Sequence, residues 1–358
     1  MKSKVAVVKT SPETVLDDID RALQLADVEQ FLPKDAATLL KVNITWHYYY
    51  PACSTTPWQL DGVASALEKR GYKNLIPAQN RTVVVNPKHG AVNNHLISVM
   101  KKHNLEFVYL YEPHIEWINY RPKAKMLVLD TVFNGRIEIP KLFIGKNAFH
   151  LPTLKTHVFT TITGAMKNAF GGLLNDNRHW THACIHETLV DLLQIQKEIH
   201  PGIFCVTDGT IAGSGAGPRV MEPHIKNYLL ASGDSVAIDA IAAKMMGFNP
   251  MHLKFLNLAH ERNLGVAKPQ DIEIVGCDIN NVNFHFRQTD TFASRGQKAI
   301  YWGKLKPFEH ILLRSPIVPW SFLASRMYHD FFWYNVFGKT IVRKYLNTDW
   351  GRLFTSYK

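Results

Sequence analysis

The stretch that decides the fold runs HLPTLKTH over residues 150–157 and continues TTITGAMKNAFGG over residues 160–172. Its apolar start, residues 149–151, indicates the end of a strand, and we expect a polar loop that carries Lys155 and His157 to follow it. Ligands of open α/β sheets bind outside the carboxyl ends of the strands. The stretch therefore predicts both an α/β fold and the position of its site.

Short apolar runs alternate with helical patterns on both sides of that stretch. We predict strands over residues 5–8, 37–44, 75–77, 107–110, 126–129, 202–207 and 272–275, and helices that begin near residues 11, 57, 187 and 234. This alternation favours mostly parallel sheets covered by helices. We predict two α/β lobes, residues 1–150 and residues 151–285, with the main site motifs in the second. A basic aromatic C-terminal arm then covers residues 286–358.

The bulk composition is that of a globular protein. Hydrophobic residues make up 46% and charged residues 20% of the 358 positions, so disorder is not expected. The formal net charge of +11 is concentrated near the end of the chain, because residues 291–358 hold 11 Lys and Arg against 3 Asp and Glu. The rest of the chain is close to balanced.

The arm interleaves these basic residues with large aromatic side chains. They are Tyr301, Trp302, Phe308, Trp320, Phe322, Tyr328, Phe331, Phe332, Trp333, Tyr334 and Phe337. Such an arm either packs across the main body or lies on an anionic membrane surface, for which aromatic and basic residues are suited. Nucleic acid is not expected as a partner, because no nucleic-acid-binding motif accompanies the charge.

The four cysteines, Cys53, Cys184, Cys205 and Cys277, are far apart and show no CxxC spacing. Neither a disulfide framework nor a cysteine-ligated iron–sulfur cluster within a single chain is therefore expected. The sequence shows no signal-peptide pattern at its start and no apolar run long enough to span a membrane. We predict a cytoplasmic protein, with the arm as the one region suited to a membrane.

The segment after His157 has the composition of an anion site. Thr163 and Gly164 precede Lys167 and Asn168, so hydroxyls, free backbone N–H groups at a helix start and lysines come together. These groups suit a carboxylate or a phosphate. The alternative is a Thr-capped helix with surface lysines.

A histidine cluster follows in the segment NRHWTHACIHE, residues 177–187. If residues 181–198 are helical, His182 and His186 lie on one face and could share a metal ion, with His179 as a third ligand. General acid–base work is the other functional reading, since the pKa of histidine lies near neutrality. Ordinary hydrogen-bonded histidines are the structural alternative.

A third polar segment, TDGTIAGSGAGPR, covers residues 207–219. Here a strand is predicted to deliver Asp208 to a glycine-rich loop, where Asp208 could orient a histidine or hold a cation. Gly215 and Gly217 would let a ligand approach the backbone, or would only permit a tight turn. The loop matches neither a Walker loop nor a clean GxGxxG, so NAD or ATP binding is not supported.

Smaller features complete the predicted site. Lys41 and Asn43 end an N-terminal strand, and Thr55 lies just before the next helix. Asp234 begins an Ala-rich helix, either as part of the site or as its N-cap. No nucleophile elbow occurs, so hydrolysis through a covalent intermediate is not expected.

These residues carry a resemblance to domain-of-unknown-function family 362. The resemblance covers roughly residues 38–277 and is carried by KVN at 41–43, TTP at 55–57, LPTLKTH at 151–157, TGAMKNAFG at 163–171, RHWTH at 178–182, DG at 208–209, GAGP at 215–218 and ASGDSVAID at 231–239. Some relatives carry ferredoxin-like modules, which implies redox work. This chain lacks the cysteine runs, so electron delivery would need a separate electron-transfer partner.

More distantly, the Lys-x-His and Thr-Gly elements resemble the nickel-pincer lactate racemases. In that family histidine and lysine side chains hold a nickel-bearing nucleotide in a two-domain α/β enzyme. The resemblance implies that His157, Lys155, Lys167 and His182 are the positions to test.

We therefore predict an enzyme of redox or hydride/proton-transfer type that acts on an anionic small molecule, with a cofactor that the sequence does not identify. Lys155, Lys167 and Asn168 would bind the anion or a cofactor phosphate, while His157 and His182 carry protons or ligate a metal ion. The alternative is a non-catalytic ligand carrier or a membrane-surface scaffold that uses the arm.

Overall fold

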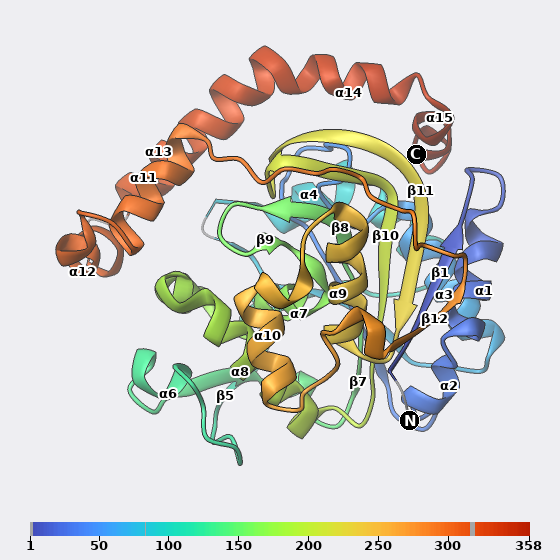
Figure 1. Ribbon diagram of the computed structural model, residues 1–358, viewed down its shortest axis with the longest axis horizontal. Helices are drawn as coiled ribbons and strands as arrows, with labels where there is room; N and C mark the ends of the chain where they lie inside the picture. The colour runs from blue at the N-terminus through green and yellow to red at the C-terminus, as the bar shows by residue number, and fades with distance from the viewer. Residues whose placement is uncertain (1–2, 83, 316–318) are drawn as a thin grey trace.

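The computed structural model describes residues 3–82, 84–315 and 319–358 (Figure 1). Its strands are β1 (Ser3–Lys9), β2 (Thr38–Val42), β3 (Leu75–Gln79), β4 (Val108–Tyr109), β5 (Trp117–Tyr120), β6 (Ile137–Pro140), β7 (Asn147–Leu151), β8 (Thr153–His157), β9 (Thr161–Ile162), β10 (Ile203–Ala216), β11 (Val220–Ser232) and β12 (Ile272–Gly276). One large sheet has the order β12-β1-β11-β10-β7-β2-β3-β4, with β8 and β9 attached beside β10. β5 and β6 pair separately.

The large sheet is mostly parallel. β10, β7, β2, β3 and β4 pair in parallel, whereas β11 pairs antiparallel with both β10 and β1. The predicted α/β class is therefore confirmed, with one long antiparallel hairpin, β10–β11, that the sequence analysis did not anticipate.

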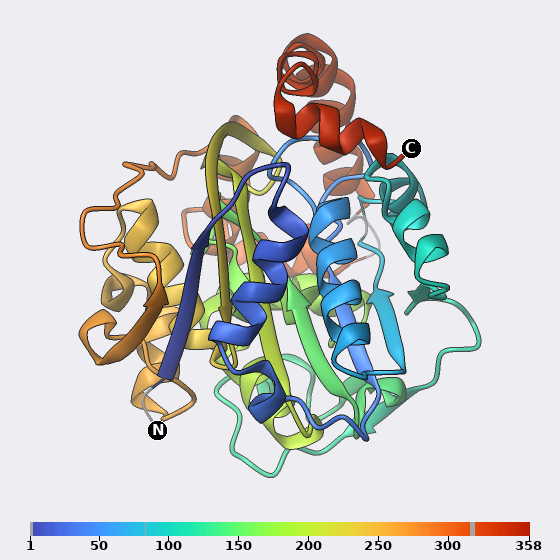
Figure 2. The same ribbon diagram turned by 90° about the vertical axis from the view of Figure 1, so that its right-hand side faces the viewer.

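Helices cover both faces of the sheet, and the C-terminal helices run along one edge of the molecule (Figures 1 and 2). The α-helices are α1 (Val15–Leu25), α2 (Val28–Phe31), α3 (Pro57–Lys69), α4 (Pro87–Asn93), α5 (Leu96–Lys102), α6 (Leu129–Val132), α7 (Gly164–Asn168), α8 (Ile185–Ile199), α9 (Ser235–Met246), α10 (Lys254–Glu261), α11 (Phe292–Tyr301), α12 (Glu309–Arg314), α13 (Pro319–Arg326), α14 (Lys339–Leu346) and α15 (Asp349–Ser356). Short 3₁₀ turns join them at η1 (Lys141–Phe143), η2 (Ala169–Gly171), η4 (Pro250–His252), η5 (Pro269–Asp271) and η6 (Lys306–Phe308), with the longer 3₁₀ segment η3 (Asp176–Cys184) and the π-helical η7 (Met327–Gly338).

Each face of the sheet has its own apolar core. Ile19 of α1 and Leu60 of α3 pack with Val8 and Phe149 on one face, the face towards the viewer in Figure 2. The helices α7, α8 and α9 pack with alternate residues of the same strands on the other face. Side chains alternate along a strand, so a sheet buried on both faces reads as a continuous apolar run.

Local signals placed several elements correctly. The predicted helix at Thr56-Pro57 is α3, and the Thr56 hydroxyl accepts a hydrogen bond from the backbone N–H of Gln59. β2, β3, α8, α9 and β12 also form where apolar runs predicted them. Each of these elements has a capping residue or a buried run of its own.

The strand predicted over residues 126–129 is wrong. Asp191 of α8 accepts hydrogen bonds from the backbone N–H groups of Leu127, Val128 and Leu129 at 2.7, 2.9 and 3.1 Å. In a strand these backbone N–H groups would instead donate to carbonyls of a neighbouring strand. The short helix α6 begins at Leu129. A distant side chain thus overrides the local apolar pattern.

The predicted boundary at residue 150 falls inside β7, whose neighbours in the sheet are β2 and β10. Strands from residues 1–150 and from residues 151–285 thus share one sheet, and β1 pairs with both β11 and β12. The division into two lobes stays a prediction about folding units.

The C-terminal arm crosses the body as a chain of helices from α11 to α15 (Figure 1). Trp333, Trp350 and Phe354 join the apolar core on the α1–α3 side of the sheet. Among the described residues, no helix is long and apolar enough to cross a membrane.

Candidate functional site

Lys155 and His157 lie on β8, not on the loop that the sequence predicted. β8 pairs in parallel with β10 and antiparallel with β9, so this segment continues the sheet beyond Pro152. Thr153, Lys155 and His157 alternate along the strand and share one side of it. The extended pairing buries both side chains, whereas a loop would have left them in solvent.

The Lys155 side chain is 1% exposed and fixed by two hydrogen bonds. Its Nζ donates to the backbone carbonyl of Cys53 at 2.6 Å and to the Thr153 hydroxyl at 2.8 Å. Burial lowers the pKa of Lys155 to about 8, because the charged form loses its hydration. No carboxylate contacts this amine in the part of the chain that the structure describes.

His157 is buried beside Lys155 and is held in one tautomer. The backbone N–H of Phe159 donates to His157 Nδ1 at 3.1 Å, so the neutral ring carries its proton on Nε2. Burial holds the pKa of His157 well below its usual value, and the positive charge of Lys167 lowers it further. His157 is therefore a neutral hydrogen-bond donor at physiological pH.

Lys167 on α7 approaches the same group. Its Nζ lies 5.3 Å from the centroid of the Phe170 ring. Burial lowers the pKa of Lys167 to about 7, and the nearby charges of Lys155 and Arg178 act in the same direction. An amine with this pKa is partly neutral at physiological pH, so it can accept as well as donate a proton.

His182 of η3 completes the cluster. Its Nδ1 donates to the backbone carbonyl of His179 at 2.9 Å, which leaves the Nε2 lone pair of the neutral ring as an acceptor. Burial lowers the pKa of His182 to about 3. The centroid of the His182 ring lies 5.6 Å from that of Phe159 and 5.5 Å from that of Phe170. The ring also stacks on Tyr301 of α11, with 5.8 Å between the centroids. The first helix of the arm thus covers this side of the site.

The start of α7 is not an open anion site, which corrects the sequence prediction. The backbone N–H groups of Ala165 and Met166 donate to the carboxylate of Asp239, at 2.6 and 2.9 Å. Gly164 has φ +71°, and a Cβ at this position would lie 2.4 Å from that carboxylate. Asp239 of α9 therefore occupies the position that a ligand anion would need.

The residue before α7 is Thr163, whose hydroxyl belongs to the predicted anion site. It is buried and has no hydrogen-bond partner among the described residues. The backbone N–H of Thr163 donates to the carbonyl of Lys155 at 3.0 Å, so this residue joins α7 to β8.

Lys41 and Asn168 meet next to the cluster, at the end of β2. Asn168 Nδ2 donates to the carbonyl of Lys41 at 2.7 Å, and Lys41 Nζ donates to the side-chain oxygen of Gln79. Burial lowers the pKa of Lys41, and the charge of Arg178 lowers it further. Lys41 and Asn168 thus form a second polar group of the site.

Asn43 and Thr55 connect neighbouring loops. The backbone N–H of Asn43 donates to the Thr55 hydroxyl, which in turn donates to the carbonyl of Leu151, both at 2.7 Å. Their hydrogen bonds hold the loop before α3 against the end of β7.

Asp208 does not orient a histidine. It lies inside the long strand β10 and accepts hydrogen bonds from Thr56 Oγ1 at 2.6 Å, Trp58 Nε1 at 3.0 Å and the backbone N–H of Thr210 at 2.8 Å. With all of these donors in place, the carboxylate anchors the start of α3. The prediction of an orienting role is wrong, because β10 continues through the predicted glycine-rich loop.

Asp234 and the two glycines also have structural roles. Asp234 is the N-cap of α9 and accepts from the backbone N–H groups of Val236 and Ala237. Gly215 has φ +104° at the end of the β10–β11 hairpin. A Cβ at Gly217 would lie 1.8 Å from the carbonyl oxygen of Thr156, so this glycine permits close packing against β8.

The three histidines predicted as metal ligands are not arranged as a metal centre. η3 extends to Cys184 and α8 begins only at Ile185, so His182 and His186 do not share one α-helical face. The carbonyls of residues 176 and 179 bind the Nδ1 atoms of His179 and His182. Across the described residues, no group of three His, Cys, Asp or Glu side chains could hold a metal ion.

The sequence analysis missed three contributors to the site. Arg178 is buried and donates to the carbonyl of Asn175 at 3.0 Å, and its charge acts on Lys41, Lys167 and His182. Phe159 and Tyr301 form the aromatic wall around His182. Arg178 stood in the histidine-rich segment, so its position was a usable signal, whereas no sequence signal links Tyr301 to His182.

Comparisons with known proteins identify a family for most of the segment that holds the cluster. A family model described as "Domain of unknown function (DUF362)" matches residues 38–244, which include every residue of the cluster except Tyr301. A thylakoid-associated protein of Synechocystis sp. is 29% identical over 124 residues, which is 33% of this chain and 37% of that protein. The match thus spans little more than a third of the relative's length. No solved structure matches the chain.

Proposed function

We propose that this chain, which belongs to the family described as "Domain of unknown function (DUF362)", is an enzyme that binds an anionic small molecule and transfers a proton to or from it. The supporting observation is that the positive charges of Lys155 and Arg178 act on Lys167, and those of Lys155 and Lys167 act on His157, inside a buried site. Buried charges are ordinarily paired. An anionic ligand would supply the missing partner.

The residues divide the work according to their environments. Lys155, fixed by Cys53 and Thr153, would bind the anionic group as an ammonium ion. Lys167, with its pKa near 7, would accept a proton from the bound molecule as a neutral amine and return it as an ammonium ion. His157 would donate its Nε2–H to oxygen atoms on which negative charge develops.

Proton transfer is better supported than hydride or electron transfer. The cluster itself contains titratable groups close to neutrality, so proton transfer needs nothing further. A redox reaction would need a cofactor or a separate electron-transfer partner, and a metal-dependent one would need ligands beyond the histidine cluster. The aromatic wall of Phe159, Phe170 and Tyr301 would keep water away from the reacting groups.

Exchange of carbon-bound hydrogen with solvent tests the proposal without knowledge of the product. Small carboxylates and phosphate esters are incubated with the protein in D₂O and followed by proton NMR. We expect deuterium to enter at least one compound with the unaltered protein, and Lys167→Met to abolish it. Lys101→Met, an exposed lysine on α5, is the matched control. Equal exchange in the two variants would refute the role of Lys167.

A second function from a different class is a non-catalytic carrier or a membrane-surface scaffold. The observation that favours it is the row of exposed apolar residues on the arm, which a catalytic role does not require. Under this alternative, substitutions at Lys155 and Lys167 leave the biological role intact and substitutions on the arm remove it. Complementation of a deletion strain with both sets of variants distinguishes the two functions.

A further inference from the structure

The arm carries most of the large apolar side chains that the structure leaves in solvent. Among the described residues, Phe31, Val92, Leu127, Ile144 and Ile225 are the exposed large hydrophobics before residue 290. The arm adds Phe292, Trp302, Leu305, Phe308, Ile311, Trp320, Leu323, Met327, Phe331, Phe332, Val336 and Phe337. An exposed patch of this kind marks an interaction surface.

These side chains form a stripe along the continuous helix α13-η7-α14. Leu323, Met327 and Phe331 follow one another at four-residue spacing and are 62%, 54% and 64% exposed. Phe332 and Val336 extend the same exposed run, whereas Phe337 lies beside Trp333 and lines a pocket with residues of β10 and β11. We call Leu323, Met327, Phe331, Phe332 and Val336 the outer face of the arm. Helical spacing places side chains four residues apart on one side of a helix.

The opposite, inner face is fixed to the body by buried and polar contacts. Trp333 and Tyr334 pack on Trp46, with ring centroids 6.0 and 5.1 Å apart. The carboxylate of Asp330 accepts a hydrogen bond from Trp46 Nε1 at 2.7 Å and lies 3.6 Å from His47 Nε2. The continuous helix α13-η7-α14 therefore packs on the body with its inner face and exposes its outer face to solvent.

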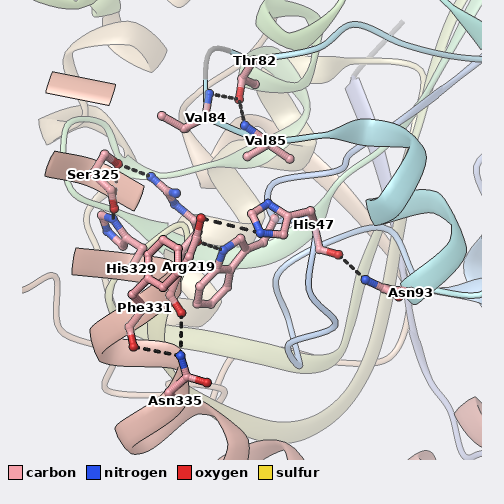
Figure 3. A network of polar contacts seen from close by, with 12 residues as sticks. His47, Thr82, Val84, Val85, Asn93, Arg219, Ser325, His329, Phe331 and Asn335 are labelled. Carbon is pink, nitrogen blue, oxygen red and sulfur yellow. Dashed lines mark hydrogen bonds and ion pairs between the residues drawn. The ribbon is translucent and has the colours of Figure 1, made fainter. Parts of the chain in front are cut away.

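A second set of contacts fixes the arm one turn earlier. Arg219 of the β10–β11 connection donates to the Ser325 hydroxyl at 3.3 Å, and His329 Nδ1 donates to the Ser325 carbonyl at 2.8 Å. Figure 3 shows Arg219 lying between Ser325 and His47, where the network joins the arm to the body. The outer face points away from these anchors, so folding of the chain itself does not cover it.

Positive charge flanks the outer face. Arg326 lies at its start, and Lys339, Arg343 and Lys344 follow it on α14, all exposed. None of these four side chains forms an ion pair with another described residue. Apolar side chains between lysines and arginines are the combination that an anionic lipid surface binds, because acyl chains receive the rings and head groups receive the cations.

We propose that the outer face of the arm docks the protein on an anionic lipid bilayer, lying in the interface without crossing it. This docking deepens the membrane-surface function proposed above, and it uses no residue of the buried site, so its failure would leave the proposed enzyme activity untouched. A second copy of the chain is a poorer occupant, since residues 291–358 carry a net charge of +8 and two arms would repel each other. The aromatic outer face also exceeds what binding to phosphate groups alone would need.

Co-sedimentation of the full chain with vesicles tests the proposal. Vesicles of phosphatidylcholine alone are compared with vesicles in which part of it is replaced by phosphatidylglycerol. We expect binding only to the second kind, and at least about a tenfold loss of partitioning in Phe331→Ser/Phe332→Ser. Val92→Ser, a 59% exposed apolar residue on α4, is the control and keeps full binding.

The charge requirement has its own pair of variants. Arg343→Glu/Lys344→Glu is expected to remove binding to the anionic vesicles, while Lys73→Glu/Lys101→Glu, with the same change in net charge on exposed body residues, retains it. Because all of these side chains are exposed, the thermal unfolding midpoint should stay within a few degrees of the unaltered protein. Leu323→Ser/Met327→Ser replaces the phenylalanine pair if that variant unfolds.

Three results would overturn the proposal. One is equal partitioning of the outer-face variants and the unaltered protein. Another is the absence of binding to anionic vesicles. The third is a dimer in analytical ultracentrifugation that Phe331→Ser/Phe332→Ser dissolves, with no vesicle binding by the monomer, which would assign the face to a second copy of the chain.

Discussion

The buried cluster around Lys155 and the outer face of the arm are opposites: the cluster buries ionisable side chains, and the outer face exposes apolar ones. The cluster places amines and imidazoles inside the protein, where no carboxylate of the described residues forms an ion pair with them. The arm places phenylalanines outside, where the described part of the chain leaves them more than half exposed. Folding alone favours neither arrangement, because a buried charge loses hydration and an exposed ring keeps water ordered around it.

The two regions therefore require different kinds of binding partner. A small anion can neutralise the cluster from within, whereas only an extended surface can cover a stripe as long as the outer face. The cluster contacts the arm at α11, before the outer face begins: Tyr301 stacks on His182, and the neighbouring Trp302 donates to the carbonyl of Ala183 at 2.7 Å.

Removal of a buried cation should weaken anion binding most. Lys155→Met is expected to lower the affinity for inorganic phosphate about a hundredfold, because a charge-assisted hydrogen bond in a buried site contributes roughly 1.5–3 kcal/mol. Calorimetric titration at pH 7 measures the affinity. Unchanged affinity would mean that the cluster is a structural feature and does not depend on a bound anion.

Gly164→Ala should destabilise the protein by about 2–4 kcal/mol, because the added methyl combines a strained φ with a clash against the Asp239 carboxylate. Gly135→Ala is the matched control, with φ +74° and nothing within 4 Å of the added Cβ, and it should cost only about 1 kcal/mol. Urea unfolding of both variants measures the two costs. Equal losses of unfolding free energy would show that the added methyl group does not clash with the Asp239 carboxylate.

Lys167→Met should stabilise the ligand-free protein by roughly 1–3 kcal/mol at pH 7. The folded-state pKa of Lys167 is lowered to about 7, whereas the unfolded chain stays protonated up to about 10.5. Stability of the unaltered protein therefore rises as the pH increases between these values, and the advantage of the variant shrinks. Urea unfolding at pH 7 and pH 9.5 tests this, and a pH-independent advantage would contradict the assignment.

The anchor of the arm should give the smallest effect. Asp330→Asn is expected to cost about 1 kcal/mol, since it weakens the contacts with Trp46 and His47 without opening a cavity. Hydrogen exchange should speed up within residues 327–338 and stay unchanged in β10. Asp349→Asn, which loses only an exposed ion pair with Arg352, should leave both regions as they were.

Local signals in the sequence predicted much of the fold and the neighbourhood of the site. Helix α3 follows from Thr56-Pro57, and β2 and β12 follow from their apolar runs, since caps and periodicity act between near neighbours. The same signals failed at residues 126–129, where the backbone donates hydrogen bonds to Asp191, a residue of helix α8. The antiparallel hairpin β10–β11 was missed because its glycines are typical of a loop.

The sequence by itself determined the α/β class, the basic aromatic character of the arm and the segment in which lysines and histidines gather. Only the tertiary structure decided which of these groups act together. Asp239 is 75 residues from Gly164 and Tyr301 is 119 residues from His182, yet the first closes the start of α7 and the second covers the histidine. Burial, which sets the pKa of Lys167, is likewise a property of packing between elements, and no local pattern of residues encodes it.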